Sequence, residues 1–177
     1  MEKASDRLNK LAVSATLAMT NKSRELKEQG IDVINLSIGE PDFDTPEYIK
    51  EAAKKAIDEN YTHYPPVPGY TELRKAIVNK FKRENNLDFT VDQIVVSTGA
   101  KHSIINVFLS VLNPGDEVIV PAPYWVSYVD MVKLADGTVV EIPCGIDQDF
   151  KMTPAQSKSA LNSNTRAIIF SSPSNPT

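Results

Sequence analysis

Apolar residues recur along this chain with two different periods. In several stretches they return every three or four positions, which is the spacing of one face of a helix. Between those stretches they form short runs bounded by glycine, proline or asparagine, which is typical of buried strands. The predicted helices cover residues 16–29, 46–57, 70–81, 99–112 and 125–135, with a further helix after Pro154. The predicted strands cover residues 31–38, 94–96, 117–120, 138–142 and 166–170.

The alternation of strands with helices determines the expected fold class. Two strands that are joined through a helix pair in parallel, because the chain crosses over before it returns to the sheet. We therefore expect an α/β fold, a three-layer α/β/α arrangement in which helices cover both faces of a mostly parallel sheet. The sequence contains no internal repeat, low-complexity segment or interdomain linker.

Capping residues and turn formers predict the ends of several helices. Gly30 should stop the first helix in a left-handed conformation. Thr45 should cap the second helix, whose apolar face we expect to be packed. Thr90 and Gln93 have the spacing of a capping box. The prolines within residues 61–69 exclude a helix or a central strand and predict a shaped loop.

Composition and charge exclude several classes of function. The chain has 177 residues, 41% of them hydrophobic and 24% charged, as in an ordinary globular protein. A net charge of −4 and the lack of any basic run exclude a nucleic-acid partner. Cys144 is the only cysteine, and neither histidine lies at metal-ligand spacing from it, so we expect no disulfide and no metal. The polar N-terminus and the lack of a long apolar run predict a cytoplasmic protein without a membrane partner.

The stretch from Val95 to Ser103 predicts an anion site. An apolar run turns there through Gly99 directly into the first turn of a helix. Backbone N–H groups point outward at such a turn and the helix dipole adds partial positive charge, so an anion is held without a catalytic side chain. An ordinary turn between a strand and a helix has the same pattern, and this stretch alone leaves both interpretations open.

Special residues follow three more of the predicted strands: Gly39, Trp125 and Asn175. The carboxyl ends of parallel strands meet at one edge of a sheet, so these residues can come together with Gly99. A helix N-terminus, a flat ring, an amide and a flexible glycine suit a flat, phosphorylated, aromatic ligand. Each residue also has a plainer role, because tryptophan is often part of a core and asparagine or glycine often forms a bend.

Three residues that carry hydroxyl groups also have two interpretations. Ser14 and Thr16 precede or begin the first predicted helix and can simply cap it. Tyr64 lies in the proline-rich loop, where it can pack its ring or project its hydroxyl into a neighbouring site. The residues by themselves do not decide between these roles.

Six short motifs give the chain a resemblance to a known family. They are Ser14-Ala15-Thr16, Gly39-Glu40-Pro41-Asp42-Phe43, Tyr64-Pro65-Pro66 with Gly69, Gly99-Ala100-Lys101, Pro121-Ala122-Pro123-Tyr124-Trp125 and Ser174-Asn175-Pro176-Thr177. With them the sequence resembles the class I aminotransferases of the pyridoxal-phosphate fold-type I group, and among these the bacterial aspartate aminotransferases. The resemblance covers essentially the whole chain, and the motifs together are highly specific.

The resemblance implies pyridoxal 5′-phosphate as the cofactor. The backbone N–H groups of Gly99, Ala100 and Lys101 would then hold the cofactor phosphate. Trp125 would stack on the pyridine ring, and Asn175 would hydrogen-bond the 3-hydroxyl oxygen of that ring.

The resemblance also implies a homodimer and a set of substrate-binding residues. Tyr64 would reach the phosphate that is bound by the other subunit. Gly39 would contact the α-carboxylate of the substrate, while Ser14, Thr16 and the ammonium group of Lys101 would recognise an acidic side chain. The implied substrate-binding residues are Ser14, Thr16, Gly39, Lys101, Trp125 and Asn175.

The implied reaction moves an amino group between an amino acid, L-aspartate, and 2-oxoglutarate. Residues 1–45 would form the N-terminal arm and a first segment associated with the small domain. Residues 46–177 would form the first part of the large cofactor-binding domain, which is therefore incomplete.

Two departures from the family pattern change this picture. Relatives often carry Lys-Pro before the Ser-x-Thr motif, whereas this chain has Ala12-Val13, which removes a cation and weighs against prephenate as a substrate. The family's Schiff-base lysine, the aspartate that pairs with the pyridine nitrogen and the arginine that binds the α-carboxylate lie downstream of Asn-Pro-Thr and are absent. We therefore expect an N-terminal portion that is inactive by itself, binds the cofactor weakly, and aggregates or assembles through uncovered sheet surfaces.

Three other functions are alternatives, and the first of them has the least support. A nucleotide-binding module would need a G-x-G-x-x-G or G-x-x-x-x-G-K-[ST] motif, and neither occurs. A non-catalytic interaction protein derived from an aminotransferase would lack the downstream lysine. Within the family, an aromatic or alanine transaminase and a carbon-sulfur lyase also remain open.

Overall fold

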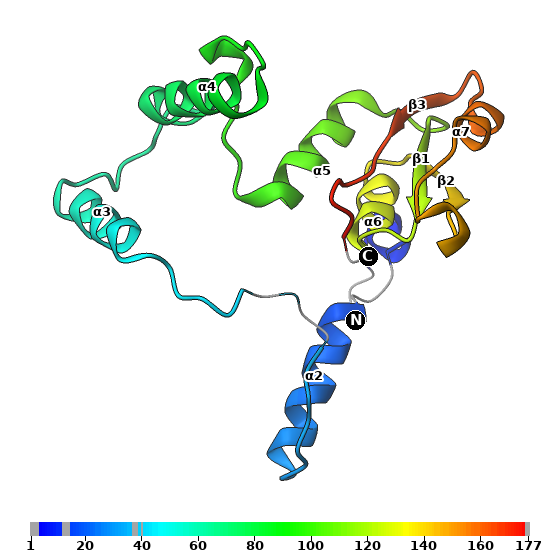
Figure 1. Ribbon diagram of the computed structural model, residues 1–177, viewed down its shortest axis with the longest axis horizontal. Helices are drawn as coiled ribbons and strands as arrows, with labels where there is room; N and C mark the ends of the chain where they lie inside the picture. The colour runs from blue at the N-terminus through cyan, green and yellow to red at the C-terminus, as the bar shows by residue number, and fades with distance from the viewer. Residues whose placement is uncertain (1–3, 12–14, 37–38, 40, 176–177) are drawn as a thin grey trace. The chain divides into compact units, whose positions relative to one another are not determined.

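The computed structural model describes residues 4–11, 15–36, 39 and 41–175 (Figure 1). The chain divides into two compact units, which are treated separately below. Residues 1–12 and 97–177 form the first, called the sheet unit, and residues 13–96 form the second, called the helical unit. The expected division of the family fold at residue 45 concerns complete domains and stays a prediction.

The sheet unit is built on three parallel strands. β1 (Glu117–Ala122) lies in the centre, between β2 (Thr138–Pro143) and β3 (Thr165–Ile168). The register with β2 runs without interruption from Glu117 opposite Thr138 to Ala122 opposite Pro143. The register with β3 shifts between Glu117 and Val118. Parallel pairing on both sides of β1 confirms the expected α/β class.

Helices cover both faces of this sheet, as Figure 1 shows. Val118 and Val120 are fully buried and share a core with α5 (Gly99–Val111) and α6 (Ser127–Leu134). Ile119 points to the opposite face, because side chains alternate along a strand, and packs with residues near α7 (Pro154–Ala160). The three-layer arrangement is therefore confirmed for this unit.

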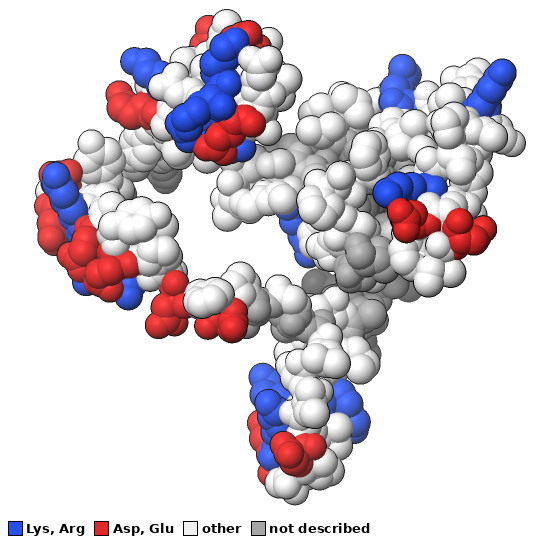
Figure 2. Space-filling view, in the orientation of Figure 1, with Lys and Arg blue, Asp and Glu red and all other residues white. Residues whose placement is uncertain are grey.

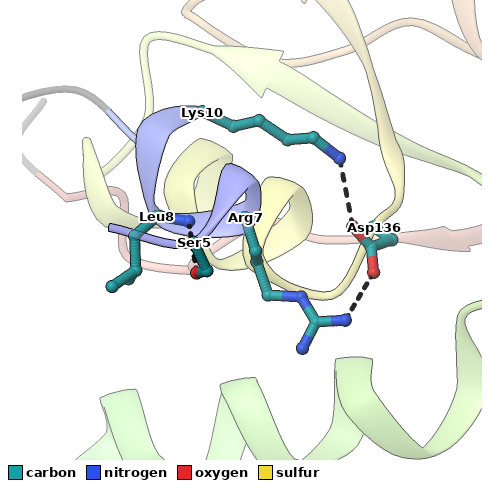
Figure 3. Close-up of polar contacts among 5 residues, drawn as sticks. All are labelled: Ser5, Arg7, Leu8, Lys10 and Asp136. Atoms are coloured by element: carbon teal, nitrogen blue, oxygen red, sulfur yellow. Dashed lines mark hydrogen bonds and ion pairs between the residues drawn. The ribbon is translucent and has the colours of Figure 1, made fainter. Parts of the chain in front are cut away.

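The N-terminal helix α1 (Asp6–Asn9) contacts α6, and ion pairs join the two helices. Figure 3 shows the carboxylate of Asp136, just after α6, between the side chains of Arg7 and Lys10. The two nitrogen–oxygen distances are 2.8 and 3.2 Å. These hydrogen bonds hold the pKa of Asp136 below its ordinary value. We call this arrangement the Asp136 clasp.

The helical unit contains α2 (Ala15–Glu28), α3 (Glu47–Asp58), α4 (Thr71–Asn85) and the short 3-10 helix η1 (Val91–Gln93). Gly30 has a φ of 78° and follows α2, as predicted. The capping box of Thr90 with Gln93 is also confirmed. Within the described residues, no helix is long and apolar enough to cross a membrane.

Two strands predicted for the helical unit do not form in its described part. Residues 31–36 are not in a ladder, and Ile34 and Leu36 are 85% and 89% exposed. A strand needs a neighbouring strand for its backbone groups, and among the described residues no ladder includes this segment. Residues 94–96 form no ladder either, and the N–H of Val96 donates instead to the carbonyl of Pro68 at 3.0 Å.

The predictions for α3 need correction. Thr45 does not cap it, because the helix begins after Pro46 and no side chain caps its N-terminus. Its apolar face is not packed among the described residues, since none of α3 is buried. Ion pairs such as Lys50 with Glu47, at 2.7 Å, support its surface instead. Figure 2 shows both signs of charge side by side over this helix.

The segment that leads out of the helical unit is fixed by a buried arginine and a glycine. Arg74 on α4 donates from Nε to the carbonyl of Ile94 at 3.0 Å and from its guanidinium to the carbonyl of Val91. Gly69 has a φ of 97°, and a Cβ at this position would lie 2.8 Å from Cγ2 of Val96. The bonds of Arg74 hold residues 91–94 against α4, and the missing side chain at position 69 leaves the room that Val96 occupies.

Replacing Asp136 by asparagine should release α1 from α6. Asparagine tolerates the left-handed backbone at this position, where φ is 58°, so the variant removes only the charge. We expect trypsin to cut after Arg7 and Lys10 faster in D136N than in the unchanged protein. In the unchanged protein, cleavage at these sites should become faster as the salt concentration is raised, because salt screens the ion pairs. Acidification should also release α1, because the clasp is present above the ordinary carboxyl pKa and is lost as pH falls through the lowered pKa of Asp136. Hydrogen exchange at the amides of α1 measures this release at pH values where trypsin does not act.

The matched control is D149N. Asp149 also has a φ of 58° and pairs with a lysine, Lys151 at 2.9 Å, but contacts no residue of α1. It should leave cleavage after Arg7 and Lys10 unchanged. Equal cleavage rates in D136N, D149N and the unchanged protein would show that the clasp does not retain α1.

Candidate functional site

The N-terminus of α5 is open and suited to an anion. The helix begins at Gly99, as predicted, with a φ of 80°. Nothing lies within 4 Å of the position that a Cβ of Gly99 would occupy. The adjoining N-cap residue, Thr98, makes no side-chain capping bond. Among the described residues, the positive end of the helix dipole therefore has no capping side chain at Thr98 and no atom crowding Gly99.

The backbone donors at this turn fall into two pairs. The N–H of Thr98 donates to Nδ1 of His102 at 3.1 Å, and the N–H of Gly99 donates to the carbonyl of Ser97 at 2.9 Å. The next two N–H groups belong to Ala100 and Lys101, and the first turn of a helix offers them no carbonyl. The described part of the chain gives them no other acceptor, so they are available to a ligand.

The ring of Trp125 lies next to this helix turn. The ammonium of Lys101 lies 5.0 Å from the centre of the indole ring, a cation–π contact. The edge of the same ring system packs against Tyr128 at 5.5 Å and 88°. Because Tyr128 lies on α6 and is part of the buried core, the indole ring packs against a side chain that is itself held in place. The structure thus brings together two of the loops that the sequence places at one sheet edge.

A second polar contact holds the loop just before Trp125. The hydroxyl of Tyr124 donates to a carboxylate oxygen of Glu141 on β2 at 2.6 Å. The hydrogen bond to Glu141, burial, and repulsion by the carboxylate together raise the pKa of Tyr124 to about 12. This bond ties the end of β1 to the neighbouring strand.

A cavity of about 570 Å³ opens near the carboxyl ends of β1 and β3. Its lining includes Tyr124, Tyr128 and residues 170–174. Asn175 follows that lining directly, with its N–H donating to Oγ of Ser171 at 3.1 Å and its side chain exposed. The predicted role of its amide stays a prediction.

The other predicted site residues belong to the helical unit. Thr16 lines an apolar groove between α2 and residues 33–36. Gly39 is exposed, and Tyr64 is fully exposed. Ser14 lies outside the described residues. Their roles toward a substrate or cofactor stay predictions.

Two features of the site are not anticipated from the sequence. The bond between His102 and Thr98 joins residues four apart, a spacing that also fits a plain surface histidine. The contact of Tyr124 with Glu141 depends on the parallel register of β1 and β2. Across the described residues, no group of three or more histidine, cysteine, aspartate or glutamate side chains is placed to hold a metal ion.

Comparison with known proteins gives one consistent match. The model of the family described as aminotransferase class I and II matches residues 31–177. The aspartate/prephenate aminotransferase of Cereibacter sphaeroides is 54% identical over 173 residues, which are 98% of this chain and 43% of that protein. The aspartate aminotransferase of Bacillus sp. strain YM-2 is 48% identical over 176 residues, which are 99% of this chain and 45% of that protein.

Solved structures agree with this match. Aspartate aminotransferase from Thermus thermophilus with maleate superposes with a TM-score of 0.96 at 45% identity, covering 100% of this chain and 46% of that one. The enzyme from Rhizobium meliloti gives a TM-score of 0.95 at 42% identity, covering 100% and 44%. This chain spans less than half the length of the relatives that it matches.

Replacing Glu141 by glutamine should lower the pKa of Tyr124 from about 12 toward the ordinary value of 10. The amide can still accept the hydroxyl hydrogen but carries no charge to oppose phenolate formation. In the unchanged protein this pair contributes stability below pH 10 that is lost between pH 10 and about 12, because the unfolded chain ionises first. Tyrosinate absorbance in a pH titration measures the pKa, and denaturant unfolding at pH values from 10 to about 12 measures the loss of stability.

The control for this titration is Glu117→Gln. Glu117 also lies on the sheet, but its carboxylate accepts from Asn162 at 2.7 Å and not from a tyrosine. This variant should leave the highest tyrosine pKa in place. A highest pKa that is the same in E141Q and E117Q would contradict the assignment.

Proposed function

Because the chain belongs to the aminotransferase class I and II family, we propose that it is the N-terminal portion of a pyridoxal-phosphate-dependent aminotransferase. The whole protein would move an amino group between L-aspartate and 2-oxoglutarate. The observation that carries this proposal is the open N-terminus of α5 beside the ring of Trp125. The names of the relatives, which are aspartate or aspartate/prephenate aminotransferases, support it.

The residues at this turn fit the phosphate of the proposed cofactor. A phosphate dianion needs several donors and a positive field, and the N–H groups of Ala100 and Lys101 at a helix N-terminus supply both. The space beside Gly99 leaves room for the anion to approach the backbone. When bound, pyridoxal phosphate supplies an electron sink for bond cleavage at the α-carbon of the substrate. The residues of this chain bind and orient it.

The cation–π contact suggests that Lys101 binds the cofactor phosphate with its backbone and the substrate with its side chain. The backbone of Lys101 faces the proposed phosphate position, while its side chain extends over Trp125. An ammonium held in this way is available to a second carboxylate, such as that of aspartate, through a charge-assisted hydrogen bond worth roughly 1.5–3 kcal/mol. Trp125 would then serve both the cofactor ring and the position of the lysine.

The remaining roles are part of the same proposal. Asn175 would bind the 3-hydroxyl oxygen of the cofactor, and Tyr64 would reach the phosphate of the other subunit in a homodimer. Gly39, Ser14 and Thr16 would contact the substrate. The lysine that binds the cofactor covalently would lie outside these 177 residues. We also propose a cytoplasmic location, on the basis of the single cysteine.

Replacing Trp125 by leucine in the whole protein should weaken pyridoxal phosphate binding by about 10-fold, or ~1.4 kcal/mol, because an aromatic stacking surface is lost. Equilibrium titration followed by the cofactor's absorbance measures the change. The control is Val126→Ala, which alters the next, half-exposed residue. Equal affinity in W125L and V126A would contradict the proposed role. Failure of the unchanged protein to transaminate aspartate with 2-oxoglutarate would contradict the proposed activity.

Prephenate is a second candidate substrate. It is favoured by the name of the 54% identical relative from Cereibacter sphaeroides, although this chain has Ala12-Val13 where relatives often have Lys-Pro. Residues 12 and 13 lie outside the described residues.

Replacing Ala12 by lysine should raise kcat/KM for prephenate several-fold, because the added cation can pair with a further carboxylate. The value for aspartate should stay nearly constant, and A12Q, which adds length without charge, is the control. High activity toward prephenate in the unchanged protein, equal to that of A12K, would show that this position does not decide the preference.

A further inference from the structure

We propose that His102 is a positioning residue for the phosphate-binding turn. Its Nδ1 accepts the N–H of Thr98 at 3.1 Å, which ties the N-cap residue of α5 to the first turn of the same helix. The inference rests on the proposed function, since it concerns how the chain presents Ala100 and Lys101 to the cofactor phosphate.

The bond takes the place of an ordinary helix cap. An N-cap threonine usually accepts an N–H of the first turn with its hydroxyl, but Thr98 makes no such bond. Here the side chain of His102, the fourth residue of the helix, accepts the N–H of the cap residue, a role that the third residue has in a capping box. The hydroxyl of Thr98 is therefore not needed to close the turn.

The consequence concerns which N–H groups face outward. With the N–H of Thr98 bonded to His102 and the N–H of Gly99 bonded to Ser97 at 2.9 Å, the donors of the N-cap residue and of the first helix residue are satisfied within the chain. The turn at Gly99, where φ is 80°, is held from both sides. The N–H groups of Ala100 and Lys101 are then presented in one direction before any ligand arrives, which lowers the ordering cost of binding.

The contact needs an acceptor at one position of the side chain. In His102 that acceptor is Nδ1, which accepts the N–H of Thr98 through its lone pair. Asparagine can reproduce this acceptor with Oδ1, which lies at nearly the same distance from the backbone as Nδ1. Leucine has similar bulk but no acceptor, and it is a better helix former than histidine. A loss of binding in a leucine variant is therefore not caused by a weaker helix.

The test compares H102L and H102N in the whole protein, with Ser103→Ala as a control on the same exposed turn of α5. The dissociation constants of pyridoxal phosphate and of pyridoxal, which lacks the phosphate, are measured for each. In H102L we expect the affinity for pyridoxal phosphate to fall about 5-fold, the effect of one lost hydrogen bond, with no change for pyridoxal. In H102N and S103A the affinity for pyridoxal phosphate should stay within about 2-fold of the original.

Hydrogen exchange at the amide of Thr98 supplies a second readout that does not depend on the cofactor. Exchange should be slow in the unchanged protein and in H102N, and faster in H102L. Rapid exchange of this amide in the unchanged protein would overturn the inference even if H102L failed to fold. An equal loss for both ligands in H102L, or no rescue by H102N, would also overturn it. A protein that binds pyridoxal phosphate no better than pyridoxal would instead contradict the proposed function.

Discussion

The structure of the sheet unit depends on the burial of one strand. Val118, Ile119 and Val120 in β1 are completely inaccessible to water, and β1 has a parallel neighbour on each side. A strand whose two faces are both covered must be apolar at consecutive positions, since neither face can carry polar groups. The layers of α5 with α6 on one face and α7 on the other follow from that single requirement.

The site depends on where this strand ends. Beyond Ala122 the chain leaves the sheet, and Tyr124 and Trp125 follow within a few residues. Tyr124 is fastened to β2 through Glu141, and Trp125 is fastened to the core through Tyr128. Lys101 then reaches the indole from α5. The flat ring and the helix N-terminus are thus brought together by two elements. The loop of Trp125 is held by contacts with β2 and the core, and α5 is held by packing on the sheet.

Features that depend on nearby residues could be predicted from the sequence. The capping box at Thr90, the stop at Gly30 and the start of α5 at Gly99 each rest on backbone preferences within a few positions, and each was confirmed. The parallel sheet was predicted from the alternation of apolar runs with amphipathic stretches. The ring of Trp125 could be placed near Gly99 because parallel strands send their ends to one edge.

Features that depend on distant partners could not be predicted. The apolar run at residues 31–36 has the composition of a strand, but in the described part of the chain it forms no ladder. Thr45 is a good capping residue, yet α3 begins two positions later, after Pro46. The contact of His102 with Thr98 needs one rotamer at one helix turn, and no spacing rule selects it over a solvated histidine.

The crowding at Gly69 has a consequence for how the sequence can vary. Any side chain there meets Val96, and the backbone of residue 69 also lies in a region that residues with a Cβ rarely adopt. A smaller residue at position 96 would relieve the collision but would leave the unfavourable backbone geometry in place. The two positions therefore differ in the substitutions they tolerate. A smaller residue at position 96 does not disturb Gly69, whereas a residue with a Cβ at position 69 keeps an unfavourable backbone even when position 96 is smaller.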